Sequence, residues 1–339
     1  MANPVPGSLE WLAQVEEEIL DPEREIVDPH HHLWRREGFD YLLSDLWADT
    51  GSGHRITATV FVECRAEYRT SGPEQLRCVG ETEFVAAVAA ESRARNDGNQ
   101  AVISAIVAHA DLTAPDQLDA VLAAHKAAGK GLFRGIRHAG ARDPHPEALT
   151  IPGRAPEGLY GRTDFRRGLT RLGELGYSYD TWHYHHQNAA FAELARAVPG
   201  TTMVLDHFGT PLGVGPYAEH RQDIFEKWKK DITAIAACPN VVAKLGGLAM
   251  PDNGFGWDRR TTPAGSDELV AAQSAYYLHT IDAFGPERCM FESNFPVDKR
   301  SVSYAVYWNA MKKLAAGFSE TEQQALFAGT ARRIYRLPA

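Results

Sequence analysis

The sequence has few cysteines, and no two of them are spaced as a metal-binding or redox pair. The four cysteines among the 339 residues are Cys64, Cys78, Cys238 and Cys289. The absence of a Cys-x-x-Cys pair excludes a Cys-based zinc site, and the wide scatter excludes the disulfide framework of a small secreted protein. This usage predicts a reduced protein of the cytoplasm.

Long apolar runs and blocks of like charge are also absent. No apolar stretch approaches the roughly 20 residues that a membrane-spanning helix needs. The acidic start, with Glu16, Glu17 and Glu18, lacks the basic and apolar regions of a signal peptide. The net charge of −9 argues against a general nucleic-acid partner. We therefore expect a small-molecule substrate, no nucleic acid and no membrane, and leave a homo-oligomer open.

The sequence does contain a regular alternation of strand-like apolar runs and helix-like segments. Strands are expected at 25–28, 55–63, 101–108, 131–137, 177–184, 201–206, 240–245 and 288–293, and helices at 81–94, 114–128, 187–198, 223–237 and 266–284. Such alternation implies parallel pairing, and eight units predict an α/β fold closed into a (β/α)8 TIM barrel. The main alternative is a doubly wound open sheet, but no Gly-x-Gly-x-x-Gly follows a strand to support a dinucleotide-binding fold.

The domain organisation predicted from this pattern is simple. We find no convincing linker, short repeat or low-complexity tract in the chain. Residues 1–339 are therefore expected to form a single domain. Residues 1–24 are expected to be an N-terminal extension with one short helix.

Polar residues gather where the predicted strands end. They include nine of the 14 histidines, and the full set is His30, His31, His32, Glu63, His109, Arg134, Arg137, His138, His183, His185, His186, Asp206, His207, Lys244, Glu292 and Asn294. Barrel enzymes carry their chemistry at the carboxyl ends of the strands, which all meet on one face. One such histidine alone is more often structural, but the whole set favours a functional site.

The run from Val27 to Trp34 is the most informative of these strand ends. His30 and His32 are two positions apart, so in a strand their side chains point to the same face. Two converging imidazoles make half of a metal site. The alternative is a cluster of core histidines whose hydrogen bonds are satisfied.

An ordered set of motifs resembles the amidohydrolase superfamily, in its branch of lactonases and decarboxylases. The matching stretches are Asp28-Pro29-His30-His31-His32, Phe133-Arg134-Gly135-Ile136-Arg137-His138, Tyr184-His185-His186-Gln187, Asp206-His207-Phe208-Gly209, Lys244-Leu245-Gly246-Gly247-Leu248 and Glu292-Ser293-Asn294-Phe295-Pro296. The resemblance implies a distorted (β/α)8 barrel with a mononuclear metal site, or a site that has lost its metal. By resemblance, His30 and His32 are the first ligand pair, and His185 and His207 are the histidines of strands five and six.

The chain departs from the family pattern at strand eight. The pattern has an aspartate that is both metal ligand and general base, and this sequence has Asn294 there. A neutral amide cannot accept a proton, although its carbonyl can still bind a metal or orient water. The carboxylates that could replace it are those of Glu292, Asp298, Glu63 and Asp206, and a histidine, His207 or His109, is the candidate if none of them acts as the base. The alternative for Glu292 is a buried partner of an arginine.

The expected cofactor is one divalent metal ion, since the resemblance implies that two-metal members of the superfamily bridge their metals with a lysine at the end of strand four, and no lysine ends strand four here. Zinc suits three or four imidazoles, manganese suits a site richer in carboxylates, and a metal-independent site stays open. Arg137 is expected to grip a carboxylate or lactone oxygen, unless it forms a salt bridge to a neighbouring strand. His138, Glu63 and Trp182 are the other expected substrate-binding residues.

The sequence thus predicts a metal-dependent hydrolase that opens a lactone by attack of water. The first alternative is a non-oxidative decarboxylase or hydratase acting on a small carboxylic acid, which the neutral Asn294 keeps open. The second alternative is a non-catalytic ligand-binding barrel, which the set of histidines argues against.

Overall fold

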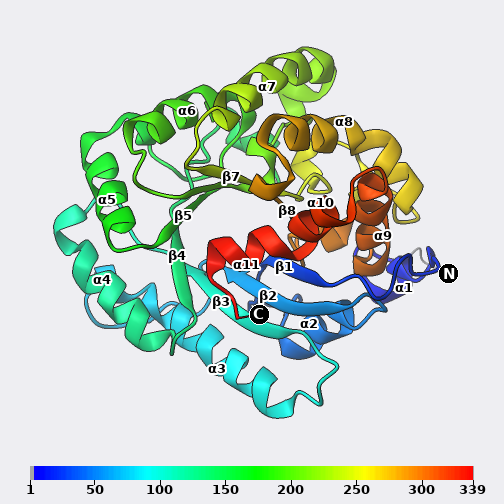
Figure 1. The fold of residues 1–339 in the computed structure, drawn as a ribbon, viewed down its shortest axis with the longest axis horizontal. Coiled ribbons are helices and arrows are strands. Elements are labelled where there is room, and N and C mark those ends of the chain that lie inside the picture. The colour runs from blue at the N-terminus through cyan, green and yellow to red at the C-terminus, as the bar shows by residue number, and fades with distance from the viewer. Residues whose placement is uncertain (1–3, 339) are drawn as a thin grey trace.

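The centre of the structure, a computed structural model describing residues 4–338, is one sheet of eight parallel strands (Figure 1). The strands are β1 (Ile26–His31), β2 (Ile56–Val62), β3 (Val102–Ala108), β4 (Phe133–Arg137), β5 (Ser178–Thr181), β6 (Met203–Leu205), β7 (Val241–Leu245) and β8 (Cys289–Phe291). They lie side by side in chain order, each parallel to the next. The (β/α)8 barrel expected from the sequence is confirmed.

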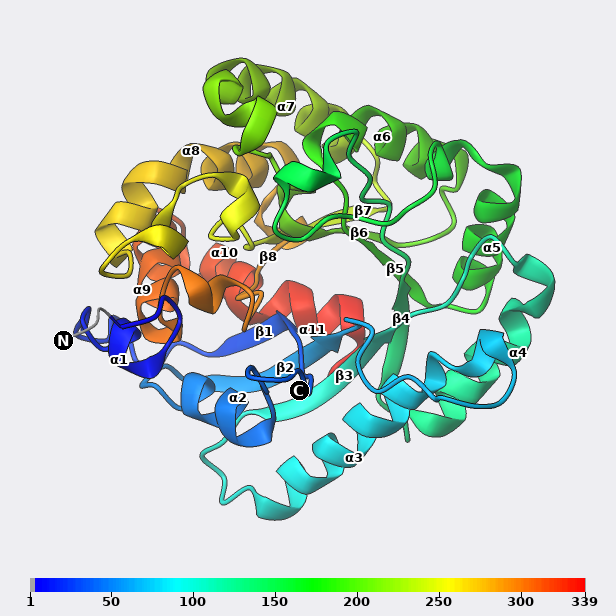
Figure 2. The same cartoon turned by 180° about the vertical axis from the view of Figure 1, so that it is seen from behind.

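Most of the helices form an outer ring around the strands (Figures 1 and 2). They are α1 (Leu9–Leu12), α2 (Leu43–Thr50), α3 (Val79–Arg95), α4 (Pro115–Ala128), α5 (Thr163–Glu174), α6 (Asn188–Ala197), α7 (Arg221–Ala236), α8 (Ser266–Phe284), α9 (Tyr304–Ala315), α10 (Glu320–Gln324) and α11 (Thr330–Tyr335). No helix among residues 4–338 is long and apolar enough to cross a membrane.

The barrel closes through the segment that follows β8. The backbone N–H of Asn294 donates to the carbonyl of His30 at 3.0 Å, and the N–H of His32 donates to the carbonyl of Phe295 at 2.9 Å. His31 and Phe295 form a parallel bridge at the same place. Closure therefore fixes the backbone of His30 against that of Asn294, at the carboxyl end of both strands.

Two strands, β1 and β5, end three residues away from the expected position, whereas β2, β6 and β8 end one or two residues earlier than expected. β1 does not end at Asp28 but continues to His31, because pairing with β2 resumes at His31 after an irregularity at Pro29 and His30. Proline lacks the N–H that a regular ladder requires, which accounts for this interruption. β5 ends at Thr181 instead of Tyr184, and His183 beyond it bonds to side chains.

Helix α5 was not expected from the sequence. Its twelve residues contain two glycine and three arginine residues, so the segment is polar on average although its few apolar side chains lie on one helical face. The buried side chains are Phe165, Leu169 and Leu172, at the spacing of one helical face. Tertiary packing of this face stabilises a helix that composition alone did not reveal.

The inside of the barrel is a separate apolar cluster that α11 closes. Valine side chains from β1, β2, β3, β6 and β7 pack there with Ala331 and Tyr335 of α11. Figure 1 shows α11 lying across the barrel. The hydroxyl of Tyr335 extends further and donates to Asp180 at 2.5 Å. Helix α11 therefore contacts both the apolar cluster and a buried carboxylate inside the barrel.

Two buried histidines outside the pocket make the fold sensitive to acid. His54 donates to the carbonyl of Ala305 at 2.9 Å and accepts from Lys312 at 2.8 Å, and His125 bonds in the same way to the carbonyl of His109 and to Thr82. Burial lowers the pKa of each imidazole to about 4. The unfolded chain therefore binds protons that the folded chain excludes as the pH falls from 6.5 towards 4, so stability decreases over this range.

We expect the free energy of unfolding to fall between pH 7 and pH 5 by roughly 2 kcal/mol for each of these histidines. Urea unfolding at the two pH values measures the fall. His54→Gln should lower stability at pH 7 and reduce the pH dependence, whereas the exposed control His220→Gln should change neither. Equal unfolding free energies of the wild type at pH 5 and pH 7 would contradict this prediction.

Candidate active site

A pocket of about 540 Å³ opens where the strands end. The residues expected in the site that line it are His32, Glu63, His109, Arg137, His138, Trp182, His207 and Asn294. The loop at 150–156, after β4, forms another part of the wall. The expected residues come from seven of the eight strand ends, so the predicted face of the barrel carries one shared cavity.

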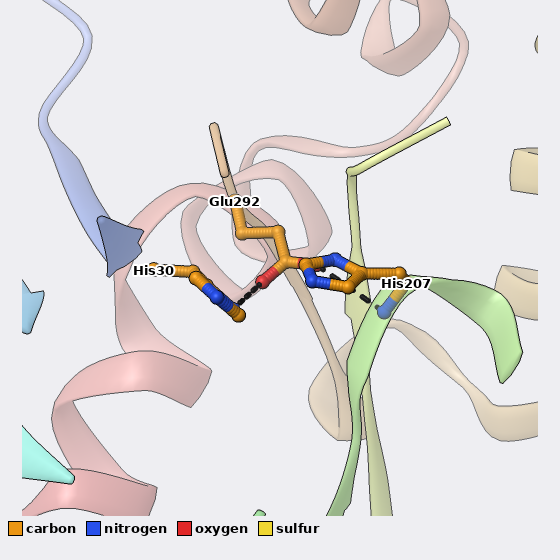
Figure 3. Close-up of side chains that lie close together, drawn as sticks. All are labelled: His30, His207 and Glu292. Atoms are coloured by element: carbon orange, nitrogen blue, oxygen red, sulfur yellow. Dashed lines mark hydrogen bonds and ion pairs between the residues drawn. The ribbon is translucent and has the colours of Figure 1, made fainter. Parts of the chain in front are cut away.

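Three buried side chains form a compact group beside this pocket. The Nδ1 atoms of His30 and His207 lie 2.7 Å and 2.6 Å from the two carboxylate oxygens of Glu292. Figure 3 shows Glu292 between the two imidazoles. One potential ligand atom from each residue lies within 4.8 Å of the others, which makes this a candidate site for a metal ion.

Unusual backbone geometry positions this group. His207 and Asn294 have φ angles of 54° and 57°, in the left-handed region that side chains other than asparagine and glycine rarely adopt. A Cβ atom on Gly247 would lie 2.4 Å from the His207 ring, and one on Gly246 would lie 2.1 Å from the carbonyl oxygen of Glu292. The two glycines therefore make room for the site, a role that their motif alone did not reveal.

Two buried cations flank the group. The ammonium of Lys244 lies 2.9 Å from Asp180, 3.4 Å from Asp206 and 3.5 Å from Nδ1 of His30. Burial acts to lower the pKa of Lys244, but the two aspartates outweigh it and raise the pKa. Arg137 lies 2.9 Å from Glu63, 3.4 Å from Asp206 and 3.4 Å from Nε2 of His30. Both ring nitrogens of His30 thus face a positive charge.

These surroundings shift the pKa values of His30 and His207 in opposite directions. Burial, reinforced by Lys244 and His207, places the pKa of His30 well below its usual value. Burial also acts to lower the pKa of His207, but the adjacent charge and hydrogen bond of Glu292 outweigh it and raise the pKa. The bond to Glu292 holds Nδ1 of His207, which leaves Nε2 as the ring nitrogen available to the pocket.

The donors present fit one divalent cation. Glu292 Oε2, Asp206 Oδ1 and Asn294 Oδ1 are buried, and Asn294 Oδ1 has no hydrogen-bond partner among residues 4–338. Glu292 Oε2 lies 2.7 Å from Nδ1 of His30 and Asp206 Oδ1 lies 3.4 Å from Nζ of Lys244, but neither contact has the angles of a hydrogen bond. Four buried carboxylates, from Glu63, Asp180, Asp206 and Glu292, face two buried cations and His207, whose pKa is raised, so even with a protonated His207 the formal charge leaves one negative charge to compensate. Two imidazoles and a carboxylate also match a catalytic zinc site with an open position. His30, His207 and Glu292 would hold the ion.

Asn294 is oriented by the carboxylate four residues further on. Its Nδ2 donates to Oδ1 of Asp298 at 2.9 Å, which turns its carbonyl oxygen the other way and leaves that oxygen unpartnered. Asp298 also accepts from the backbone N–H of Ala249, and burial raises its pKa to about 7. Asp298 does not line the pocket and reaches it only through Asn294.

The structure does not bring every residue expected as a ligand into the group. His185 accepts a hydrogen bond from the backbone of Leu212, packs against Tyr217 and does not line the pocket. His32 lines the pocket, but its Nδ1 donates to the carbonyl of Val62 at 2.8 Å, and it does not belong to the group of three.

The expected substrate-binding residues all line the pocket, with different freedom to bind. Arg137 already pairs with Glu63, the alternative that the sequence left open for this arginine. His138 accepts a hydrogen bond from the backbone of Leu112. Within the described part of the chain, residues 4–338, the buried indole N–H of Trp182 has no partner, so it can donate to a ligand.

Two contributors were missed in the sequence, Asp180 and Tyr335. Asp180 lies in the middle of β5, and only the pairing with Lys244 shows that it belongs to the site. Tyr335 comes from α11, 155 residues further along the chain. A charged residue inside a short buried strand could have indicated Asp180. No local sequence feature indicates Tyr335.

Comparison with known proteins gives consistent results. A profile of the family described as Amidohydrolase matches residues 27–337. An uncharacterized protein, y4mH, of Sinorhizobium fredii is 33% identical over 327 residues, covering 92% of this chain and 98% of that protein. An L-fucono-1,5-lactonase of Burkholderia multivorans is 28% identical over 326 residues, covering 92% and 96%. A crystal structure of a Burkholderia multivorans amidohydrolase with bound zinc has a TM-score of 0.71 and 26% identity, covering 93% of this chain and 100% of that one.

Proposed function

The chain belongs to the amidohydrolase family, and from this premise we propose that it is a metal-dependent hydrolase that opens a lactone by addition of water. The observation that carries the proposal is the His30–Glu292–His207 group beside a pocket that holds further hydrogen-bond donors. The similarity to an L-fucono-1,5-lactonase over nearly the whole chain supports the lactone as substrate.

The side chains of the pocket have separable tasks in this reaction. The unpartnered carbonyl oxygen of Asn294 accepts a hydrogen bond from the attacking water and orients it. The indole N–H of Trp182 and the guanidinium of Arg137 are the donors for the oxygen that becomes negative in the transition state. A divalent ion held by His30, His207 and Glu292 would polarise the carbonyl and lower the pKa of a bound water.

The His207–Glu292 pair can act as the general base that accepts a proton from the attacking water, which the neutral amide of Asn294 cannot do. Glu292 fixes the ring of His207 by its 2.6 Å contact with Nδ1, and Nε2 can then accept a proton from the pocket side. A carboxylate that orients an imidazole in this way also stabilises the imidazolium that forms. Nε2 of His207 cannot accept a proton while it binds a metal ion. Activity measured after metal removal therefore distinguishes the role of His207 as a base from its role as a metal ligand.

A substrate panel tests the proposed reaction. We expect turnover of five- or six-membered sugar lactones, measured as acid release with a pH indicator, and no gas release from hydroxybenzoates. Glu292→Gln should reduce the rate by about 10²–10⁴-fold, the usual size of a general-base contribution, because His207 loses the carboxylate that orients it as the base. Carbon dioxide release from a hydroxybenzoate without any lactone turnover would instead identify a decarboxylase.

A further inference from the structure

The mouth of the pocket carries a concentration of positive charge that the reaction itself does not require. Arg36, Arg65 and Arg154 line the pocket with exposed side chains, and we call them the rim arginines. They come from three different loops, after β1, β2 and β4. Glu63 is the one carboxylate among the lining residues within 4–338, and Arg137 already neutralises it.

None of the three rim arginines forms an ion pair with a carboxylate of residues 4–338, whereas Arg171 pairs with Asp119 at 2.8 Å and Arg35 pairs with Glu67 at 3.4 Å. Other exposed arginines, such as Arg77 and Arg196, also lack an ion pair within residues 4–338, but the three rim arginines line one pocket. The chain as a whole is acidic, with 44 Asp and Glu against 35 Lys and Arg. Three unpaired arginines at one opening of an acidic protein therefore mark a local field that attracts anions.

The geometry of two rim arginines is also held in place. The guanidinium of Arg36 lies 4.0 Å from the ring centroid of Trp34, a stacking contact that limits its freedom. Arg65 has a φ angle of 63°, a left-handed conformation that costs free energy for such a side chain and is retained beside the pocket. Planar guanidinium groups bind carboxylates through paired hydrogen bonds, which ammonium groups do not match.

We propose that the substrate is an anionic lactone, which carries a free carboxylate in addition to its lactone ring, and that the rim arginines bind this carboxylate. This inference rests on the proposed lactone hydrolysis. Water adds to the lactone carbonyl, the bond from the carbonyl carbon to the ring oxygen breaks, and the ring oxygen takes a proton. The product is a hydroxy acid with two carboxylates, and one proton is released to the solvent.

The test compares glucarolactone, which has a free carboxylate, with its methyl ester and with gluconolactone, which have none. We expect kcat/KM of the wild type to favour the anionic lactone by at least about tenfold, through KM, and this preference to decrease at high salt. Arg65→Gln with Arg154→Gln should reduce the preference about tenfold, and the corresponding lysine variants should restore part of it. Arg35→Gln, in the same loop as Arg36 but outside the pocket lining, is the matched control and should leave the preference unchanged.

Two results would overturn the inference while the proposed function stands: a wild type that prefers the neutral lactones, or a preference that the double variant does not reduce. If no lactone is hydrolysed, the proposed function is wrong. The binding of sugar acids then tests whether the rim arginines recognise a second carboxylate. In calorimetry, galactarate with two carboxylates should bind more tightly than galactonate with one, and the double variant should remove the difference. Equal binding of the two acids by the wild type would overturn the inference.

Discussion

Replacing His30 and His207 together with alanine is expected to abolish metal binding and hydrolysis. Their Nδ1 atoms lie within 2.7 Å of the two oxygens of Glu292, so the double variant removes two of the three ligands of the candidate site. The purified wild type should contain about one divalent ion per chain, because catalytic zinc sites normally use three protein ligands. Elemental analysis of both proteins, with activity before and after chelation, measures the effect.

Two controls distinguish metal loss from damage to the fold. His185→Gln changes a histidine that does not line the pocket and whose ring contacts Leu212 and Tyr217, and it should retain the ion. Glu292→Gln keeps the shape of the third ligand but removes its charge, and it should weaken metal binding without unfolding the barrel. Stoichiometric metal in the His30/His207 double variant would refute the assignment. A metal-free wild type with full activity would show that His207 and Glu292 act by proton transfer alone.

The barrel was predictable from the sequence because each strand is a short apolar run followed by polar residues. Parallel strands in a closed barrel are buried on both faces, so their sequences read as continuous apolar stretches that are easily located. The exact residue at which each strand ends was less predictable. For example, β1 resumes pairing at His31 only because β2 lies beside it. The twelve-residue helix α5 depends on tertiary packing in the same way.

The site was predictable as a face of the barrel but not as a set of contacts. The sequence placed His30, His207 and Glu292 at strand ends, and the structure shows that Glu292 bridges the two histidines instead of pairing with an arginine. The contact of Tyr335 with Asp180 requires the C-terminal helix to fold across the barrel. No spacing within a strand encodes such a contact, because it joins residues 155 positions apart.

Replacing Asn294, the asparagine that follows β8, with aspartate is expected to have the second large effect on activity. Asn294→Asp would place a carboxylate where an amide now donates to Asp298 at 2.9 Å. Burial already raises the pKa of Asp298 to about 7, and two carboxyl groups at this distance cannot both ionise, so they would share a proton. We expect the variant to lose at least about 10²-fold in kcat/KM, because the group that orients water is displaced and the pair repels.

The effect should depend on pH in a defined direction. An acid whose pKa is raised in the folded state binds a proton that the unfolded chain has released, so stability falls as the pH rises through the raised pKa. Asn294→Asp should therefore be less stable at pH 8 than at pH 6, by more than the wild type is. Urea unfolding at the two pH values, together with pH–rate profiles, measures both effects.

The exchanged pair provides the decisive comparison. Combining Asn294→Asp with Asp298→Asn restores one amide donor and one carboxylate acceptor at the same 2.9 Å contact, with their positions reversed. This double variant should regain the stability lost in Asn294→Asp, because the repulsion is removed and the hydrogen bond returns. It would also place a carboxylate beside the pocket, where it should bind a divalent cation more tightly than the amide does. Asn294→Asp alone with wild-type activity and stability at pH 8 would show that the neutral side chain has no part in the site.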